Sequence, residues 1–199
     1  MKQLIDVKKL TDKKFLNLYE ATYKLEDGST TPWNFASRKP LNNINDMNKV
    51  AQEKKPDAVN IVTYYHDSNN VLHFLLIKEY RSPFNAYFIS FPAGLVENGE
   101  TVEEAAIREV KEEIGGEAIL TKEIIHFAST SAGVSNEANA FVSVEVNPIL
   151  HKQQLEKTED ITVLDMTASE VDEMIEEGKE TFELSTLLFL KLLIDTINV

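Results

Sequence analysis

The sequence contains no cysteine among its 199 residues. Disulfide bonds, zinc sites with cysteine ligands and a catalytic thiol are therefore excluded. A protein that needs no disulfide can fold in a reducing compartment, and we expect this one to act in the cytoplasm.

Positive charge and long apolar runs are also scarce. The chain has 20 Lys and Arg residues against 33 Asp and Glu residues, a formal net charge of −13. A field of that sign repels nucleic acids and anionic membranes, so neither is expected as a partner. The N-terminus has no apolar run of the signal-peptide kind, and the apolar C-terminal stretch is interrupted by Ser185, Lys191 and Asp195. We expect a small anionic substrate, drawn in by a metal ion and local arginines.

Glutamates recur at helical spacing in the segment from Gly94 to Gly115, which reads GLVENGETVEEAAIREVKEEIG. On an α-helix of about 3.6 residues per turn, Glu109, Glu112 and Glu113 fall on one face. Carboxylate oxygens that converge on one face are ligands that a hard cation such as Mg²⁺ prefers. The segment therefore predicts a divalent-metal site, and a cation held there can bridge a phosphate.

The residues around these glutamates predict where the helix begins and ends. Thr101 and Glu104 have the spacing of a capping box, so the helix should begin near Val102. Gly115 and Gly116 allow it to stop. An ordinary solvated acidic helix would not explain the glycine loop before it. The apolar residues of the helix lie on the face away from the glutamates: Val102, Ala105, Ala106, Val110 and Ile114.

The spacing of seven residues across this segment resembles the Nudix box, the signature of hydrolases that cleave nucleoside diphosphates linked to another moiety. Those residues are Gly94, Glu100, Arg108, Glu109, Glu112, Glu113 and Gly115. The resemblance implies an α/β fold, namely an α/β/α sandwich with a mixed sheet. One position departs from the pattern, because Gly116 stands where the box usually has an aliphatic residue. This departure should loosen a packing contact without removing a ligand.

Three further segments resemble the ADP-ribose pyrophosphatase branch of that superfamily: Lys78–Arg81, Phe91–Gly94 and Thr130–Glu137. That branch carries a small N-terminal antiparallel β module and is typically dimeric, so the resemblance implies a homodimer. It also implies hydrolysis of ADP-ribose to AMP and ribose 5-phosphate, with Mg²⁺ or Mn²⁺ as cofactor. Two alternatives stay open: a pyrophosphatase for another nucleoside diphosphate sugar or dinucleotide, and a non-catalytic ligand sensor with the same fold.

The resemblance assigns the metal ligands residue by residue. They are the backbone carbonyl of Ala93 with the carboxylates of Glu109 and Glu113, while Glu112 helps to hold a second ion. In hydrolysis of a pyrophosphate, ions at such a site neutralise oxygens that would otherwise repel the attacking water.

Two more residues belong to the predicted catalytic set. Arg108 should hold Glu100 and its loop in place by an ion pair. Glu137 is the preferred general base, because a loop carboxylate can swing over the substrate whereas Glu112 is committed to the metal face. The alternative for Glu137 is an ordinary exposed loop acid.

The predicted substrate contacts are an aromatic ring and two arginines. Trp33 and Arg38 have the spacing of a Trp and an Arg that contribute adenine stacking and a phosphate contact in the resembled branch. Arg81 is expected to bind a phosphate, because a planar guanidinium can do so bidentately. Packing or a dimer interface is the alternative for Trp33, and a surface salt bridge is the alternative for Arg81.

The order of the elements predicts two parts, an N-terminal β-hairpin dimerisation module (residues 1–45) and a Nudix hydrolase domain (46–199). The hairpin covers residues 15–24 and 31–37 around a turn at 26–29, and the polar stretch 39–55 reads as a linker or irregular segment. A hydrophobic content of 43% is enough for a packed core. Further strands are expected at 58–65, 71–80, 86–91, 123–129, 139–146 and 161–165, and closing helices at 169–177 and 183–198.

Overall fold

The structure is a computed structural model that describes residues 2–197. The chain forms two compact units, Met1–Asp57 with His126–Ala140 (the first unit) and Ala58–Ile125 with Phe141–Val199 (the second unit). The division falls within two strands, β8 (Ala118–Ser129) and β9 (Ala138–Val146). The assignment of residues 1–45 and 46–199 to separate functional domains stays a prediction.

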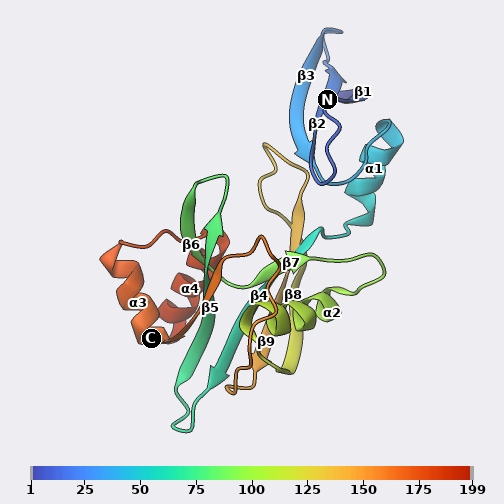
Figure 1. The fold of residues 1–199 in the computed structure, drawn as a ribbon. Helices are drawn as coiled ribbons and strands as arrows, with labels where there is room; N and C mark the ends of the chain where they lie inside the picture. Colours follow the sequence, from blue (N-terminus) through green and yellow to red (C-terminus); the bar gives the residue numbers. More distant parts are fainter. Residues whose placement is uncertain (1, 198–199) are drawn as a thin grey trace. The chain divides into compact units, whose positions relative to one another are not determined.

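The first unit contains a three-stranded antiparallel sheet of β1 (Gln3–Lys9), β2 (Asn17–Lys24) and β3 (Thr30–Ser37), in that order (Figure 1). The predicted hairpin is β2 and β3, so that prediction is confirmed. At the turn the Asp27 carboxylate accepts hydrogen bonds from the amide and hydroxyl of Ser29, and Gly28 takes a positive φ of 85°. Strand β1 was not predicted, since its short segment alternates too weakly to be distinguished from a loop.

Helix α1 (Ile44–Glu53) lies where the sequence predicted a linker, and that prediction is wrong. The Asn43 side chain caps the helix by accepting from two amide groups, and Lys54 ends it in the left-handed region. Ile44, Met47 and Val50 pack on the core of the first unit. Three apolar residues at helical spacing are enough here because a sheet surface is available to cover.

The second unit is built on a seven-stranded sheet with strand order β10-β5-β4-β9-β8, in which β6 pairs with β5 and β7 pairs with β4. Its other strands are β4 (Ala58–His66), β5 (Leu72–Arg81), β6 (Ala86–Ser90), β7 (Ala93–Leu95) and β10 (Ile161–Thr167). The α/β class is thereby confirmed. Strand β8 begins earlier than predicted, at Ala118.

Helices cover both faces of this sheet (Figure 1). Helices α3 (Ala168–Glu177) and α4 (Leu184–Ile197) pack on Phe74 and Leu76 of β5. Leu75 and Ile77 alternate with those residues and are equally buried, so they face the other side, where α2 (Val102–Glu109) contacts β4 and β7. The predicted end of the last helix at Asn198 lies outside the described residues.

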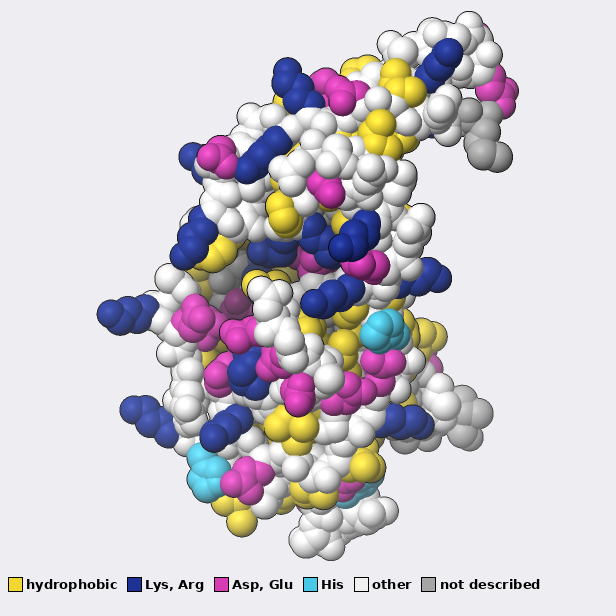
Figure 2. Space-filling view, turned by 90° about the vertical axis from the view of Figure 1, so that its right-hand side faces the viewer, with side chains coloured by type: hydrophobic (Ala, Val, Ile, Leu, Met, Phe, Trp, Pro, Cys, Tyr) yellow, Lys and Arg dark blue, Asp and Glu magenta, His cyan; other side chains and the backbone are white. Residues whose placement is uncertain are grey.

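No helix within residues 2–197 is long and apolar enough to cross a membrane. On the face shown in Figure 2, Asp and Glu side chains gather in a dense group with basic side chains among them.

Gly116 lies in a tightly packed place, contrary to the expected loosened contact. A Cβ atom at this residue would lie 2.5 Å from Cγ1 of Val146 and would also contact Val110 and Ile114. The space that an aliphatic side chain would fill is therefore already occupied by Val146.

We expect Gly116→Ala to lower the free energy of unfolding by about 1–3 kcal/mol, because overpacking forces neighbours apart. Val146→Ala removes the clashing methyl, so the double variant should lose less stability than the sum of the single losses. Denaturant titrations of the four proteins measure this, and strictly additive losses would contradict the explanation.

Candidate active site

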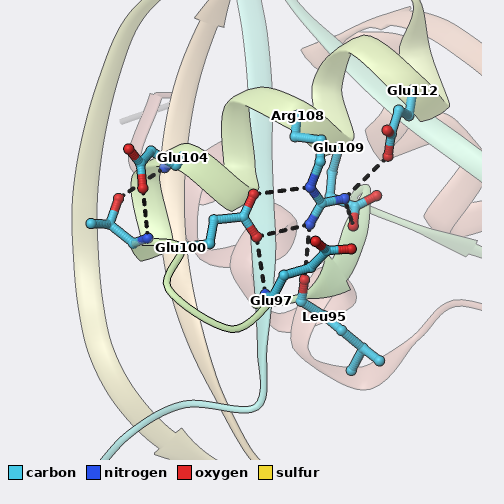
Figure 3. A network of polar contacts seen from close by, with 8 residues as sticks. Leu95, Glu97, Glu100, Glu104, Arg108, Glu109 and Glu112 are labelled. Atoms are coloured by element: carbon cyan, nitrogen blue, oxygen red, sulfur yellow. Dashed lines mark hydrogen bonds and ion pairs between the residues drawn. The ribbon is translucent and has the colours of Figure 1, made fainter.

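Arg108 lies at the centre of a polar network that joins the glycine loop to helix α2 (Figure 3). Its Nε donates to Oε1 of Glu100 at 2.9 Å, and its Nη2 donates to the other carboxylate oxygen at 3.1 Å. Nη2 also donates to the backbone carbonyl of Leu95 at 2.9 Å, and Glu100 accepts from the amide of Glu97. The expected ion pair of Arg108 with Glu100 is therefore present, and it fixes the loop.

The remaining guanidinium nitrogen of Arg108 faces the predicted metal ligands. Its Nη1 donates to Oε1 of Glu109 at 2.7 Å and to Oε2 of Glu112 at 3.1 Å. The hydrogen bonds that Arg108 donates, to Glu100 first and then to Glu109 and Glu112, raise the pKa of its guanidinium, so its charge is permanent.

Two of the three glutamates are buried. Glu109 is 8% exposed and Glu113 is 4% exposed, and one oxygen of Glu113 accepts from the amide of Ala93 at 3.1 Å. Burial raises the pKa of Glu113 to about 9, and the charges of Glu109 and Glu79 act in the same direction. Burial likewise raises the pKa of Glu109, against the opposing effect of Arg108. These carboxylates hold negative charge poorly without a nearby cation.

Gly94 makes the position of Glu109 possible. A Cβ atom on Gly94 would lie 1.6 Å from Oε1 of Glu109, so any side chain there would occupy the place of the carboxylate. The start of the helix is fixed as predicted, because Thr101 and Glu104 form the reciprocal capping box. Together these contacts bring the glutamate face of α2 onto the backbone of β7.

The sequence predicted a regular α-helix through all three glutamates, and that prediction is wrong, because α2 ends at Glu109. Residues Val110–Ile114 form one π-helical turn, in which the amide of Gly115 donates to the carbonyl of Val110. Glu112 and Glu113 lie in this wider turn. The spacing of the glutamates alone cannot distinguish an α-turn from a π-turn.

The loop between β9 and β10 closes against this π-turn. The amide of His151 donates to the carbonyl of Gly115 at 2.7 Å, and the amide of Gln154 donates to the carbonyl of Glu112 at 2.8 Å. A Cβ on Gly115 would lie 2.1 Å from the His151 carbonyl oxygen, so glycine is required by this contact as well as by its φ of 74°. The loop is thereby held beside the glutamates.

A cleft of about 460 Å³ opens beside the three glutamates and Ala93. Its wall includes Glu79, Gln154, Glu156 and Glu159, which the sequence analysis did not select. Burial is the main cause of the raised pKa values of Glu79, Glu109 and Glu113, and the charge of Glu159 is a lesser cause in the same direction. No local motif marks Glu159, because it approaches the box only through the fold.

Arg81 lines the same cleft and forms an ion pair with Glu79. Nη1 lies 2.9 Å from Oε1 and Nη2 lies 2.8 Å from Oε2 of that carboxylate. The alternative role of Arg81, a salt bridge, is therefore present in the structure, and its guanidinium also borders the cleft. Binding of a phosphate by Arg81 stays a prediction.

Three other predicted site residues belong to the first unit. Nε of Arg38 lies 2.7 Å from Oε1 of Glu137, so the predicted phosphate ligand and the predicted base form an ion pair. The loop that carries Glu137 is attached to β3, where Ala36 and Val134 share a backbone hydrogen bond of 2.8 Å. Trp33 is 52% exposed and therefore not a core residue.

The donor set of the cleft fits a hard divalent cation. All candidate ligands are oxygens, which Mg²⁺ and Mn²⁺ prefer, and a cation there would favour the ionised form of Glu109 and Glu113 against the burial that raises their pKa values. Within residues 2–197, however, no three acidic or histidine side chains are already arranged as a metal-binding group. Glu109 and Glu112 are instead turned to Arg108.

Comparisons with known proteins agree on one family. A NUDIX domain model matches residues 54–183. The chain is 29% identical over 187 residues to an ADP-ribose pyrophosphatase of Saccharomyces cerevisiae, covering 89% of this chain and 75% of that protein. It is 28% identical over 134 residues to an ADP-ribose pyrophosphatase of Bacillus subtilis, covering 67% and 69%.

The fold is also similar to a solved structure of an ADP compounds hydrolase. The TM-score is 0.69, with 18% identity, and the match covers 99% of this chain and 94% of that one. At that identity the likeness shows the fold, and it confirms the predicted architecture.

We expect Mg²⁺ to raise the melting temperature of the wild type and Gly94→Ala to abolish most of that rise, because the new Cβ occupies the position of the Glu109 carboxylate. Displacement of the Glu109 carboxylate should also lower kcat by roughly 10²-fold. Gly133→Ala is the matched control, since nothing lies within 4 Å of a Cβ there. An unchanged Mg²⁺ response in Gly94→Ala would contradict this account of the glycine.

Proposed function

Since the chain belongs to the NUDIX domain family of hydrolases, we propose that it cleaves the pyrophosphate bond of ADP-ribose to give AMP and ribose 5-phosphate. The observation that carries the proposal is the pair of buried carboxylates, Glu109 and Glu113, beside an acidic cleft. The names of the two pyrophosphatases support the choice of substrate.

The residues that would hold the metal cofactor are Ala93, through its backbone carbonyl, with Glu109, Glu112 and Glu113. When bound, Mg²⁺ or Mn²⁺ neutralises the pyrophosphate charge that repels a nucleophile and makes the attacking water more acidic. Because Glu109 and Glu113 are buried, water screens their charges poorly, and their attraction for a bound cation would be stronger than at the surface.

Arginines are proposed to bind the phosphates. Arg81 borders the cleft, and a substrate phosphate would compete with Glu79 for its guanidinium fork. In the first unit, Arg38 would exchange Glu137 for a phosphate in the same way. These guanidinium groups would supply local positive charge to an anionic substrate in a chain whose formal net charge is −13.

The exposed indole of Trp33 supports a stacking contact with adenine. Apolar side chains exposed in the same unit, such as Phe15 and Leu16, support a homodimer. A dimer and a cytoplasmic location both stay predictions.

Two carboxylates compete for the role of general base. Glu137 is proposed because release from Arg38 would leave its carboxylate without that partner and able to accept a proton. Glu159 is the second candidate, because it lines the cleft and interacts with Glu109 and Glu113.

A panel of nucleoside diphosphate derivatives, incubated with each metal and analysed for products, tests the proposed function. AMP and ribose 5-phosphate from ADP-ribose would support it. Preferential cleavage of another derivative would move the assignment to that substrate. No cleavage together with a melting shift on ADP-ribose would favour a sensor.

Glu113→Gln should lower kcat by roughly 10²-fold or more while the fold is retained, because its charge stabilises the transition state through the metal. Glu112→Gln should have an effect in the same direction. Steady-state kinetics at saturating Mg²⁺, with circular dichroism as the folding control, measure this. Near-normal turnover in both variants would rule out the metal-site assignment.

Glu137→Gln should lower kcat by roughly 10²- to 10⁴-fold with little change in substrate affinity. A general base works only when deprotonated, so its loss should flatten the acidic limb of the pH–rate profile. Glu156→Gln, on the rim of the cleft, is the control. If the limb persists in Glu137→Gln and disappears in Glu159→Gln, Glu159 is the base.

A further inference from the structure

Arg108 divides its hydrogen bonds between two groups of acceptors (Figure 3). Nε and Nη2 hold the loop through Glu100 and Leu95. Nη1 alone serves Glu109 and Glu112, the carboxylates that we assign to the metal. The second group of contacts adds nothing to the position of the loop, so it needs a separate explanation.

That explanation is charge. Glu109 is buried, and a buried carboxylate without a compensating charge is strongly destabilising. Within the described residues, Arg108 is the basic side chain that ion-pairs with Glu109 and Glu112. One side-chain cation is therefore paired with both of these carboxylates.

We infer that Arg108 is the resident cation of the metal-free site, and that a divalent ion binds by taking Glu109 and Glu112 from Nη1. Glu100 and Leu95 keep the other two nitrogens in place throughout this exchange. The inference rests on the proposed metal dependence and deepens it. Arg108 then stabilises the protein without metal and weakens metal binding, because the ion must compete with it.

A role confined to holding the loop makes a different prediction. In that case any loss of the contact between Arg108 and Glu100 would disorder the site and weaken metal binding. Under resident-cation exchange, the two ends of the ion pair have opposite effects. Removing Arg108 frees the ligands, whereas removing the charge of Glu100 leaves Arg108 more strongly attracted to them.

The test is calorimetric titration of Mg²⁺ and Mn²⁺ into metal-free wild type, Arg108→Gln, Arg108→Lys and Glu100→Gln, with melting temperatures in both states. We expect Arg108→Gln to bind metal about tenfold more tightly, or 1.4 kcal/mol. Its melting temperature should fall more without metal than with it. Arg108→Lys should be intermediate, and Glu100→Gln should bind more weakly than wild type.

Weaker or unchanged metal binding by both Arg108 variants would overturn the inference while leaving the metal site itself intact. If Arg108→Gln folds only when metal is added, the inference is supported, since the metal then replaces the missing charge. If Arg108→Gln folds in neither state, the affinity of Arg108→Lys decides. Wild type that binds neither ion would overturn the proposed metal dependence, and the inference with it.

Discussion

The burial of two carboxylates, Glu109 and Glu113, is the constraint on which the rest of this site depends. Charge in that position needs a neighbour that compensates it, and the surrounding structure supplies the amide of Ala93 to Glu113 and the guanidinium of Arg108 to Glu109. Gly94 is required because the carboxylate of Glu109 occupies the space of a side chain. Gly94 and Arg108 thus both follow from the position of this carboxylate, since the glycine leaves room for it and the arginine compensates its charge.

Local signals made much of this region predictable from the sequence. The capping box at Thr101 and the ion pair of Arg108 with Glu100 involve residues close together in the chain, and both are present. The hairpin of β2 and β3 was likewise predictable, because its turn and strand residues are contiguous. Helix α1 was missed because the surface that stabilises it comes from the strands before it.

Features that depend on distant contacts could not be predicted. Carbonyl groups at the π-turn accept hydrogen bonds from the loop between β9 and β10, which is far away in sequence. Glu159 enters the cleft through that same loop and carries no motif of its own. The sequence analysis therefore selects Glu137, a loop carboxylate, as the candidate base and overlooks Glu159, which lines the cleft beside the box glutamates.

Arg108 combines a structural and an electrostatic requirement in one side chain. Lysine could compensate the carboxylates as a point charge, but it could not also reach Glu100 and Leu95 in the fixed fork geometry of a guanidinium. Glutamine could hold part of the loop, but it would leave Glu109 without a compensating charge. The exchange that we infer gives a physical reason for an arginine between the loop and the glutamates, because its fork holds the loop while its remaining nitrogen compensates Glu109.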